Sequence, residues 1–213
     1  AGGKESVLLA DIGNTHFHIC NGSEVEHLSY EEAISKYSKQ RLCYISVKQQ
    51  LDNTIEQIAL WKNISGMIHL DGAYETMGID RQALCLSRED GLFVDAGSAI
   101  TVDVMHEGRY RGGFILPGLK AMLQAYRSIS PALDTELNEK ISLAGLPATT
   151  KDGISYGIIA SIKALIDKHS DGKNLYFTGG DGKFLSGFFT DAIYDEMLVF
   201  DGMRKVMKES ERC

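Results

Sequence analysis

The sequence contains little of what marks several common protein classes. Proline occurs only three times in 213 residues and no segment is low in complexity, so no flexible linker is evident. No apolar run approaches the roughly 20 residues that a membrane helix needs, and the first residues lack the apolar centre of a signal peptide. The four cysteines lack CxxC spacing, which favours buried or incidental thiols over a zinc site or a disulfide. These absences predict a cytoplasmic protein in a reducing compartment.

Positive charge is also scarce relative to negative charge. The 22 Lys and Arg residues are outnumbered by 29 Asp and Glu residues, which gives a formal net charge of −7. A chain with this balance has no general electrostatic attraction to nucleic acid or to an anionic membrane. We therefore expect neither of these among its partners. The hydrophobic share of 44% is enough for the core of one large domain or of two small ones.

Some common ligand-binding motifs are missing as well. No GxxxxGK[ST] segment occurs, which excludes a P-loop. The third glycine of GxGxxG is absent after Gly180-x-Gly182, so a dinucleotide fingerprint is excluded too. His16 and His18 have HxH spacing, but no third ligand accompanies them, and we do not expect a metal site there.

One acidic glycine turn, in contrast, occurs twice. An apolar run leads into Asp11-Ile12-Gly13-Asn14-Thr15, and a second one leads into Asp95-Ala96-Gly97-Ser98, 84 positions later. Glycine lets a phosphate approach the backbone closely, and the small polar residues add donors. The carboxylate becomes useful if Mg²⁺ lies between it and the phosphate. The duplication predicts two halves that bind phosphate and a cation, whereas one copy alone could be an exposed hairpin with a capping Asp.

Hydrophobic periodicity predicts the elements around these turns. In the first half, strands are expected at 6–10, 16–20, 24–29, 42–47 and 65–70, and helices at 31–39, 51–62 and 78–87. In the second half, strands are expected at 92–94, 100–105, 109–116, 174–178 and 197–200, and helices at 119–128 and 154–169. Antiparallel strands followed by alternating helices and strands, found twice, imply an α/β fold of two domains with mixed sheets. We place the domains at 1–90 and 91–213.

The segment Gly78-Ile79-Asp80-Arg81 has no counterpart in the other half, which suits a substrate-specific role. Asp80 could accept a proton from an attacking hydroxyl. Arg81 could bind a carboxylate or the phosphoryl group in transfer. The alternative is a surface ion pair at the start of a helix.

Two further positions in the second half are ambiguous. The double glycine of Thr178-Gly179-Gly180 would let a flat ligand such as a nucleoside lie against bare backbone, although a plain turn is the alternative. Asp103 shares a strand face with Thr101, and we interpret it as a surface carboxylate.

In combination these motifs resemble those of the type III pantothenate kinases. The resemblance extends from about residue 7 to residue 202. The matching segments are 11–15 (DxGNT), 78–81 (GxDR), 95–101 (DxG[TS]AxT), 112–118 (GGxIxPG) and 178–180 (TGG). The family belongs to the superfamily of acetate and sugar kinases, Hsp70 and actin. The resemblance therefore implies two duplicated ribonuclease-H-like (actin-like ATPase) domains and ATP-dependent phosphorylation of pantothenate to 4′-phosphopantothenate, the first step of coenzyme A biosynthesis.

The resemblance also implies where ATP and the cations bind. Asp11 would lie near Mg²⁺, and Asp95 would coordinate the monovalent cation, K⁺ or ammonium, that the family requires. Ser98 stands where the family usually has a threonine that contacts ATP. The other residues implied to hold ATP are Ile12, Gly13, Asn14, Thr15, His16, Phe17 and His18.

For the second substrate, the resemblance implies that Asp80 is the general base of a direct in-line transfer. Thr150 would close the pantothenate site from a partner subunit, which implies a homodimer. Tyr74 corresponds to the family's tyrosine upstream of GxDR, at a shorter spacing. The residues implied to contact pantothenate are Tyr74, Gly78, Ile79, Asp80, Arg81 and Thr150.

Two other functions are compatible with these residues. The chain could be a kinase of another small hydroxylated acid on the same fold. It could also be a non-catalytic regulatory protein, since relatives of this family were first described as accessory factors in transcription. The presence of Asp11, Asp80 and Asp95 favours an enzyme.

Overall fold

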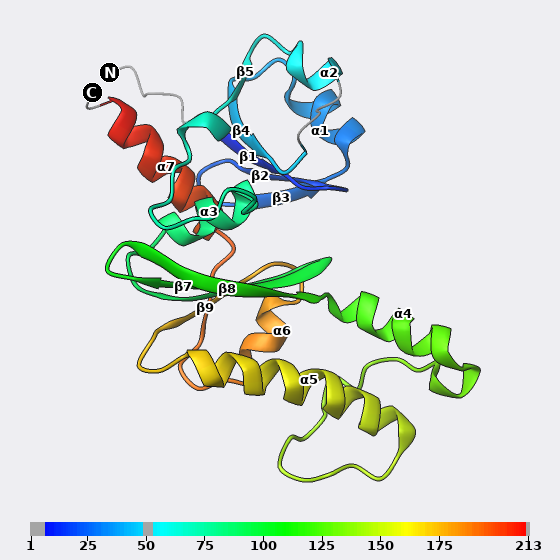
Figure 1. The fold of residues 1–213 in the computed structure, drawn as a ribbon. Helices are drawn as coiled ribbons and strands as arrows, with labels where there is room; N and C mark the ends of the chain where they lie inside the picture. The colour runs from blue at the N-terminus through cyan, green and yellow to red at the C-terminus, as the bar shows by residue number, and fades with distance from the viewer. Residues whose placement is uncertain (1–6, 49–52, 212–213) are drawn as a thin grey trace. The chain divides into compact units, whose positions relative to one another are not determined.

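A computed structural model describes residues 7–48 and 53–211 of the chain (Figure 1). Within these residues the chain divides into two compact units. Unit 1 contains the described residues up to Glu89, the short stretch Gly108–Tyr110 and the residues from Glu196 onward. Unit 2 contains Asp90–Glu107 and Arg111–Asp195. None of the helices in this part of the chain is long and apolar enough to cross a membrane.

The sheet of unit 1 has the strand order β3-β2-β1-β4-β5. Its central strand, β1, pairs antiparallel with β2 and parallel with β4. The strands are β1 (Leu8–Ile12), β2 (Phe17–Cys20), β3 (Val25–Leu28), β4 (Leu42–Ser46) and β5 (Trp61–Asn63). The helices are α1 (Tyr30–Tyr37), α2 (Asn53–Glu56), the 3-10 helix η1 (Ser65–Met67), α3 (Ile79–Leu86) and α7 (Leu198–Glu211).

The sheet of unit 2 has the order β10-β9-β6-β7-β8, and its central strand, β6, pairs antiparallel with β7 and parallel with β9. The strands are β6 (Gly91–Ala96), β7 (Ala99–His106), β8 (Arg109–Pro117), β9 (Leu175–Thr178) and β10 (Ile193–Tyr194). The helices are α4 (Leu119–Ile129), the 3-10 helix η2 (Pro131–Leu133), α5 (Thr150–His169) and α6 (Gly182–Ser186). Read from β8, this order repeats that of the first sheet read from β3. The predicted duplication of an α/β domain with a mixed sheet is confirmed.

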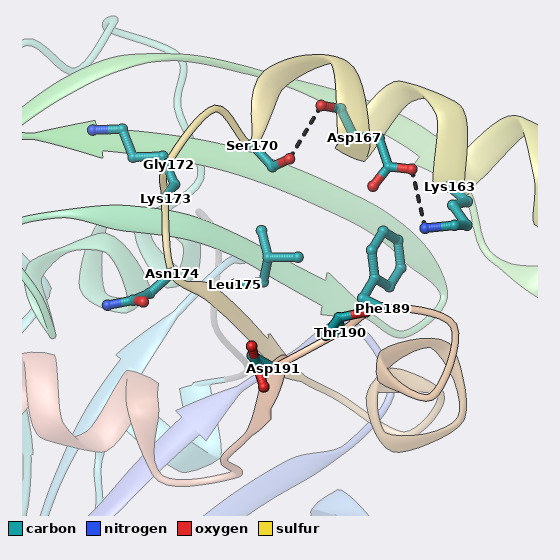
Figure 2. Close-up of a pocket in the computed structure, with 10 residues that line it drawn as sticks. All are labelled: Lys163, Asp167, Ser170, Gly172, Lys173, Asn174, Leu175, Phe189, Thr190 and Asp191. Atoms are coloured by element: carbon teal, nitrogen blue, oxygen red, sulfur yellow. Dashed lines mark hydrogen bonds and ion pairs between the residues drawn. The ribbon is translucent and has the colours of Figure 1, made fainter.

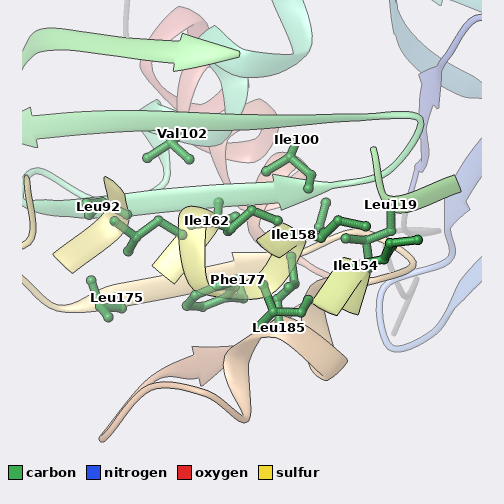
Figure 3. Close-up of a cluster of buried hydrophobic side chains, with 14 residues drawn as sticks. Leu92, Ile100, Val102, Leu119, Ile154, Ile158, Ile162, Leu175, Phe177 and Leu185 are labelled. Atoms are coloured by element: carbon green, nitrogen blue, oxygen red, sulfur yellow. The ribbon is translucent and has the colours of Figure 1, made fainter. Parts of the chain in front are cut away.

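The core of unit 2 lies between its sheet and helix α5 (Figure 3). Ile154, Ile158 and Ile162 of α5 are buried against apolar residues of the strands. Their spacing of four residues places them on one helix face, so the amphipathic helix predicted from Ile154 onward is confirmed. The helix begins earlier than predicted, because the side chain of Thr149 accepts a hydrogen bond from the backbone N–H of Asp152 and caps it.

The core of unit 1 decides which way the acidic residue of β1 points. Leu8, Ala10 and Ile12 of β1 are buried in one cluster with Phe17 of β2. Side chains alternate between the two faces of a strand. The side chain of Asp11 therefore lies on the opposite face of the sheet from this cluster.

Three predicted elements are wrong, each where a short apolar run was assigned from its pattern. Residues 65–70, predicted as a strand, contain the 3-10 helix η1. Of residues 197–200, also predicted as a strand, the last three form the start of helix α7. The helix predicted at 51–62 is a single turn, α2, followed by β5, although residues 51 and 52 lie outside the described residues. Short apolar runs can bury their side chains in either geometry, so periodicity does not distinguish them. Strand β10 was not predicted.

Helix α7 belongs to unit 1, whereas a division at residue 90 would assign it to the second domain. It packs against α3 and β1. The two helices approach closely at Gly202, where an added Cβ would lie 1.8 Å from the carbonyl oxygen of Ala83 in α3. Only a residue without a side chain permits this approach.

We expect Gly202→Ala to lower the free energy of unfolding by about 2 kcal/mol or more, because the new methyl group would force α7 away from α3. Urea unfolding followed by circular dichroism measures this. Gly153→Ala is the control, since an added Cβ at Gly153 of α5 meets no atom within 4 Å. Alanine has the higher helix propensity, so this control should be neutral or stabilising. Equal stability of the two variants would contradict the proposed close contact.

Candidate active site

The first acidic glycine turn closes the hairpin between β1 and β2. Asp11 is next to last in β1, in register with His18 of β2 and Ile45 of β4. A hydrogen bond of 2.9 Å from the backbone N–H of Gly13 to the carbonyl oxygen of His16 holds the turn. The carboxylate of Asp11 is therefore carried near the end of the central strand, beside the turn.

The residues predicted to hold ATP at this turn differ in what they expose. Asn14, Thr15 and His16 are exposed. Ile12 and Phe17 are completely buried in the core of unit 1, so only their backbone could contact a ligand. The amide of Asn14 and the hydroxyl of Thr15 are the neutral side-chain donors that the turn presents.

A residue that sequence reasoning missed supports the turn. Tyr30, the first residue of α1, donates a hydrogen bond from its hydroxyl to the carbonyl oxygen of Gly13. Its ring packs edge-on against Phe17 with the centroids 5.0 Å apart. The Nζ atom of Lys48 lies 4.7 Å from the centroid of the same ring. A tyrosine at the start of a helix matches no motif, so the sequence carried no signal for it.

His18 lies next to a second histidine. His18 and His27 are in register on β2 and β3, and their Nδ1 atoms are 2.6 Å apart. Burial, together with the smaller effects of the nearby His27 and His16, lowers the pKa of His18 from 6.5 to about 4. At neutral pH His18 is therefore uncharged and adds no cation to the predicted ATP site.

The GxDR segment forms the start of helix α3. Gly78 is the N-cap, and Asp80 lies in the first turn, where the helix dipole favours a negative carboxylate. An added Cβ at Gly78 would lie 2.8 Å from Oδ1 of Asp80, so glycine leaves room for the carboxylate. The side-chain amide of Gln82 donates a 2.9 Å hydrogen bond to the carbonyl oxygen of Met77. This bond ties the helix start to the preceding turn.

Arg81 contacts Tyr74, the tyrosine predicted to join the pantothenate site. Its Nη1 donates a 2.7 Å hydrogen bond to the hydroxyl of Tyr74, and the guanidinium lies 5.9 Å from the ring centroid. Arg81 is only 5% exposed, whereas Tyr74 is 45% exposed. Arg81 is therefore buried and does not lie at the surface. The contact brings Tyr74 to the GxDR segment despite its shorter spacing in the sequence.

The second acidic glycine turn, which lies in unit 2, has the same arrangement as the first. Asp95 is next to last in β6, in register with Thr101 of β7 and Thr178 of β9. Residues in register on neighbouring strands share a face of the sheet, so two threonines flank the carboxylate. The Oγ1 atom of Thr101 is buried without a hydrogen-bond partner among the described residues. This set of oxygen atoms fits a hard cation.

Two glycines let neighbouring segments approach this turn closely. An added Cβ at Gly118, the N-cap of α4, would lie 2.3 Å from the carbonyl oxygen of Gly97 and 2.5 Å from that of Ser98. Gly179 has a φ of 89°, and an added Cβ there would lie 2.6 Å from Oδ1 of Asp95. These contacts give the GGxIxPG and TGG segments a role in holding the turn.

The remaining positions differ in exposure. Ser98 is exposed in the second turn, and Thr150 is exposed in the first turn of α5. Asp103, interpreted as a surface carboxylate, is completely buried in β7, so that interpretation is wrong. The predicted site residues are divided between the units, with those from Asp11 to Arg81 in unit 1 and Asp95, Ser98 and Thr150 in unit 2.

A pocket of about 440 Å³ in unit 2 contains none of the predicted site residues (Figure 2). It is lined by the C-terminal part of α5, the start of β9 and the segment before β10. Both of its lysines already have anionic partners. Lys163 lies 3.0 Å from Asp167, and Lys173 lies 3.6 Å from Asp90. We therefore do not assign a substrate to this pocket.

Comparison with known proteins identifies the family. The family model described as type III pantothenate kinase matches residues 47–171. A type III pantothenate kinase of Campylobacter jejuni (strain RM1221) is 40% identical over 204 residues, which cover 96% of this chain and 98% of the relative. The chain belongs to the type III pantothenate kinase family. As a member of this family it is an enzyme that phosphorylates pantothenate with ATP, a step of coenzyme A biosynthesis.

Solved structures agree with the fold of a type III pantothenate kinase. A Campylobacter jejuni protein, described as a Baf family transcriptional activator, is 38% identical with a TM-score of 0.88, covering 97% of this chain and 100% of that chain. A Sinorhizobium meliloti protein described as a 2-dehydro-3-deoxygalactonokinase is 10% identical with a TM-score of 0.59, covering 96% of each chain. The second likeness concerns the fold alone, which is the two-domain ribonuclease-H-like fold.

We expect the free energy of unfolding of this pantothenate kinase to decrease as the pH falls from about 6.5 to about 4, because of the lowered pKa of His18. Its folded pKa of about 4 lies below the unfolded value of about 6.5, so the unfolded chain binds the proton more readily in this window. The contribution of uncharged His18 to the free energy of unfolding is therefore fully present above about pH 6.5 and is lost as the pH falls to about 4.

The measurement is urea unfolding of the parent and of His18→Gln at several pH values across this window. The variant should show a shallower decline in stability, because glutamine does not titrate. His69→Gln is the control, since His69 is an exposed histidine of the same unit. A parent and a His18→Gln variant with the same pH dependence would refute the assignment.

Proposed function

We propose that the chain transfers the γ-phosphoryl group of ATP directly and in line to the terminal hydroxyl of pantothenate, giving 4′-phosphopantothenate and ADP. The start of α3 is the observation that supports this proposal, because it holds Asp80, Arg81 and Tyr74 within one helix start and its preceding turn. A carboxylate can accept the proton of an attacking hydroxyl, and a guanidinium can bind a carboxylate. Pantothenate carries both a hydroxyl and a carboxylate.

In this proposal Asp80 is the general base, and Arg81 and Tyr74 orient pantothenate. The hydrogen bond between Arg81 and Tyr74 limits the rotation of both side chains, which reduces the entropy lost on binding. Gly78 and Ile79 complete this part of the site through the backbone of the helix start.

ATP phosphates are assigned to the turn that follows Asp11. Gly13 allows close approach to the backbone, and Asn14 and Thr15 supply donors. Mg²⁺ held by Asp11 would offset the repulsion between carboxylate and phosphates. Ser98 is assigned to ATP from unit 2, where its hydroxyl is exposed.

Asp95 is assigned to a monovalent cation, K⁺ or ammonium. The threonines in register with it, Thr101 and Thr178, provide further oxygen atoms on the same face of the sheet. The buried hydroxyl of Thr101 gains a partner if a cation is bound there. The cation would offset negative charge at the second turn.

We assign Thr150 to the pantothenate site of a partner subunit, so the active form is a homodimer. Thr150 is exposed, and the same unit exposes apolar side chains at Ile129 (71%) and Leu146 (88%). A homodimer that uses this unit would cover these side chains. We also assign the reaction to the cytoplasm, where ATP is supplied.

A regulatory function is the second candidate, because the similar Campylobacter jejuni structure is described as a transcriptional activator. The net charge of −7 disfavours direct binding to DNA. An assay of ADP release with pantothenate, with other small hydroxylated acids and without acceptor separates the candidates. ADP release dependent on pantothenate supports the proposal, and its absence would favour a regulator.

We expect Asp80→Asn to reduce kcat by about 10²-fold or more, because an amide cannot accept the proton of the hydroxyl. Binding of pantothenate, measured by calorimetry, should change little. Glu75→Gln is the matched control, since Glu75 is an exposed carboxylate a few residues upstream. Near-normal turnover of Asp80→Asn would refute its assignment as the base.

We expect Asp95→Asn to weaken activation by K⁺, because the neutral amide attracts a cation less strongly than a carboxylate. Initial rates measured over a series of K⁺ concentrations, at constant ionic strength, should show a higher half-saturating concentration. Asp171→Asn serves as the control, since Asp171 is an exposed carboxylate of the same unit. An unchanged response of Asp95→Asn to K⁺ would contradict the assignment.

A further inference from the structure

The turn assigned to ATP has a carboxylate but no cation of its own. No Lys or Arg occurs between Asp11 and His18. The phosphates of ATP add several negative charges beside Asp11, and like charges repel. A cation from another segment of unit 1 would reduce this repulsion in addition to Mg²⁺.

The segment that follows β4 lies beside the end of β1. Ser46, the last residue of β4, is in register with Ile12, and the backbone N–H of Val47 donates a 3.2 Å hydrogen bond to the carbonyl oxygen of Ile12. The next residue is Lys48. The hydroxyl of Ser46 accepts a 3.1 Å hydrogen bond from the backbone N–H of Lys48 and donates a 3.3 Å hydrogen bond to the carbonyl oxygen of Lys48. The backbone of Lys48 is thus held close to the turn.

The side chain of Lys48 is linked to the turn through Tyr30. Its Nζ lies 4.7 Å from the centroid of the Tyr30 ring, and the hydroxyl of that ring donates to the carbonyl oxygen of Gly13. No carboxylate among the described residues forms an ion pair with Lys48. A cation–π contact is weaker than a charge-assisted hydrogen bond to phosphate, so the ammonium group can exchange one for the other.

We propose that Lys48 binds the phosphates of ATP at the turn after Asp11, and that Tyr30 positions both the lysine and the turn. The inference rests on the proposed function, since it requires ATP at this turn. A lysine ammonium is a compact charge with three donors, which suits phosphate oxygens. Tyr30 acts through its neighbours and is a positioning residue.

The test measures the dissociation constants of ATP and adenosine by calorimetry for the parent, Lys48→Met and Lys48→Arg. Loss of one charge-assisted contact to phosphate should raise the Kd of ATP by about tenfold in Lys48→Met. The Kd of adenosine should not change, because adenosine carries no phosphate. Lys48→Arg should retain most of the affinity for ATP. Lys39→Met is the matched control, since Lys39 is an exposed lysine of the same unit.

The outcomes separate this inference from the proposed function. Unchanged ATP affinity in Lys48→Met, with only a lower melting temperature, would show that Lys48 is purely structural and would overturn the inference. An equal loss of affinity for ATP and adenosine would overturn it as well. In either case ADP release dependent on pantothenate in the parent would leave the proposed function standing. A parent that fails to bind ATP would overturn both.

The role of Tyr30 is tested with Tyr30→Phe, which keeps the ring and removes the hydrogen bond to Gly13. We expect the KM for ATP to rise while the KM for pantothenate stays unchanged. If Tyr30 positions Lys48, the effects of Tyr30→Phe and Lys48→Met on the Kd of ATP should be non-additive in the double variant. Strict additivity would refute the coupling between the two residues.

Discussion

The register of the central strands is the constraint on which both acidic turns depend. β1 and β6 are each paired antiparallel on one side and parallel on the other, and each carries its aspartate at the next-to-last position. A slip of one residue would turn Asp11 toward the core and Ile12 away from it. The burial of Ile12 and its apolar neighbours therefore decides where the carboxylate points. Hydrophobic packing thus determines the face of the sheet on which the carboxylate lies.

The two turns share their topology but are stabilised differently. In the first, the position that pairs with the aspartate on the antiparallel strand is His18, and an aromatic side chain, Tyr30, supports the turn from outside the sheet. In the second, the equivalent position is Thr101, and close backbone contacts at Gly118 and Gly179 take the place of an aromatic support. The two turns thus share a backbone arrangement and differ in the side chains that support it.

The sequence was sufficient for features that depend on neighbouring residues in the chain. The glycine turns after apolar strands and the apolar face of α5 are regular over enough residues to be recognised. The sequence was insufficient where contacts between residues far apart in the chain determine the structure. Helix α7 is set by packing on α3, and Asp103 is buried by its place in the sheet. Motifs named the candidate site residues, but only burial separates the exposed Asn14 from the buried Phe17, and only tertiary contact reveals Tyr30.

Because α7 belongs to the first unit, the two units are completed in an unusual order while the chain is synthesised on the ribosome. All residues of unit 2 precede α7 in the chain, and unit 1 is completed only when α7 packs against α3 and β1. Domains made of one continuous stretch usually fold in the order of synthesis. Here we expect the reverse, with the second unit able to reach its native state while the first still exposes apolar surface. Chaperone binding to the nascent chain should therefore centre on the N-terminal half.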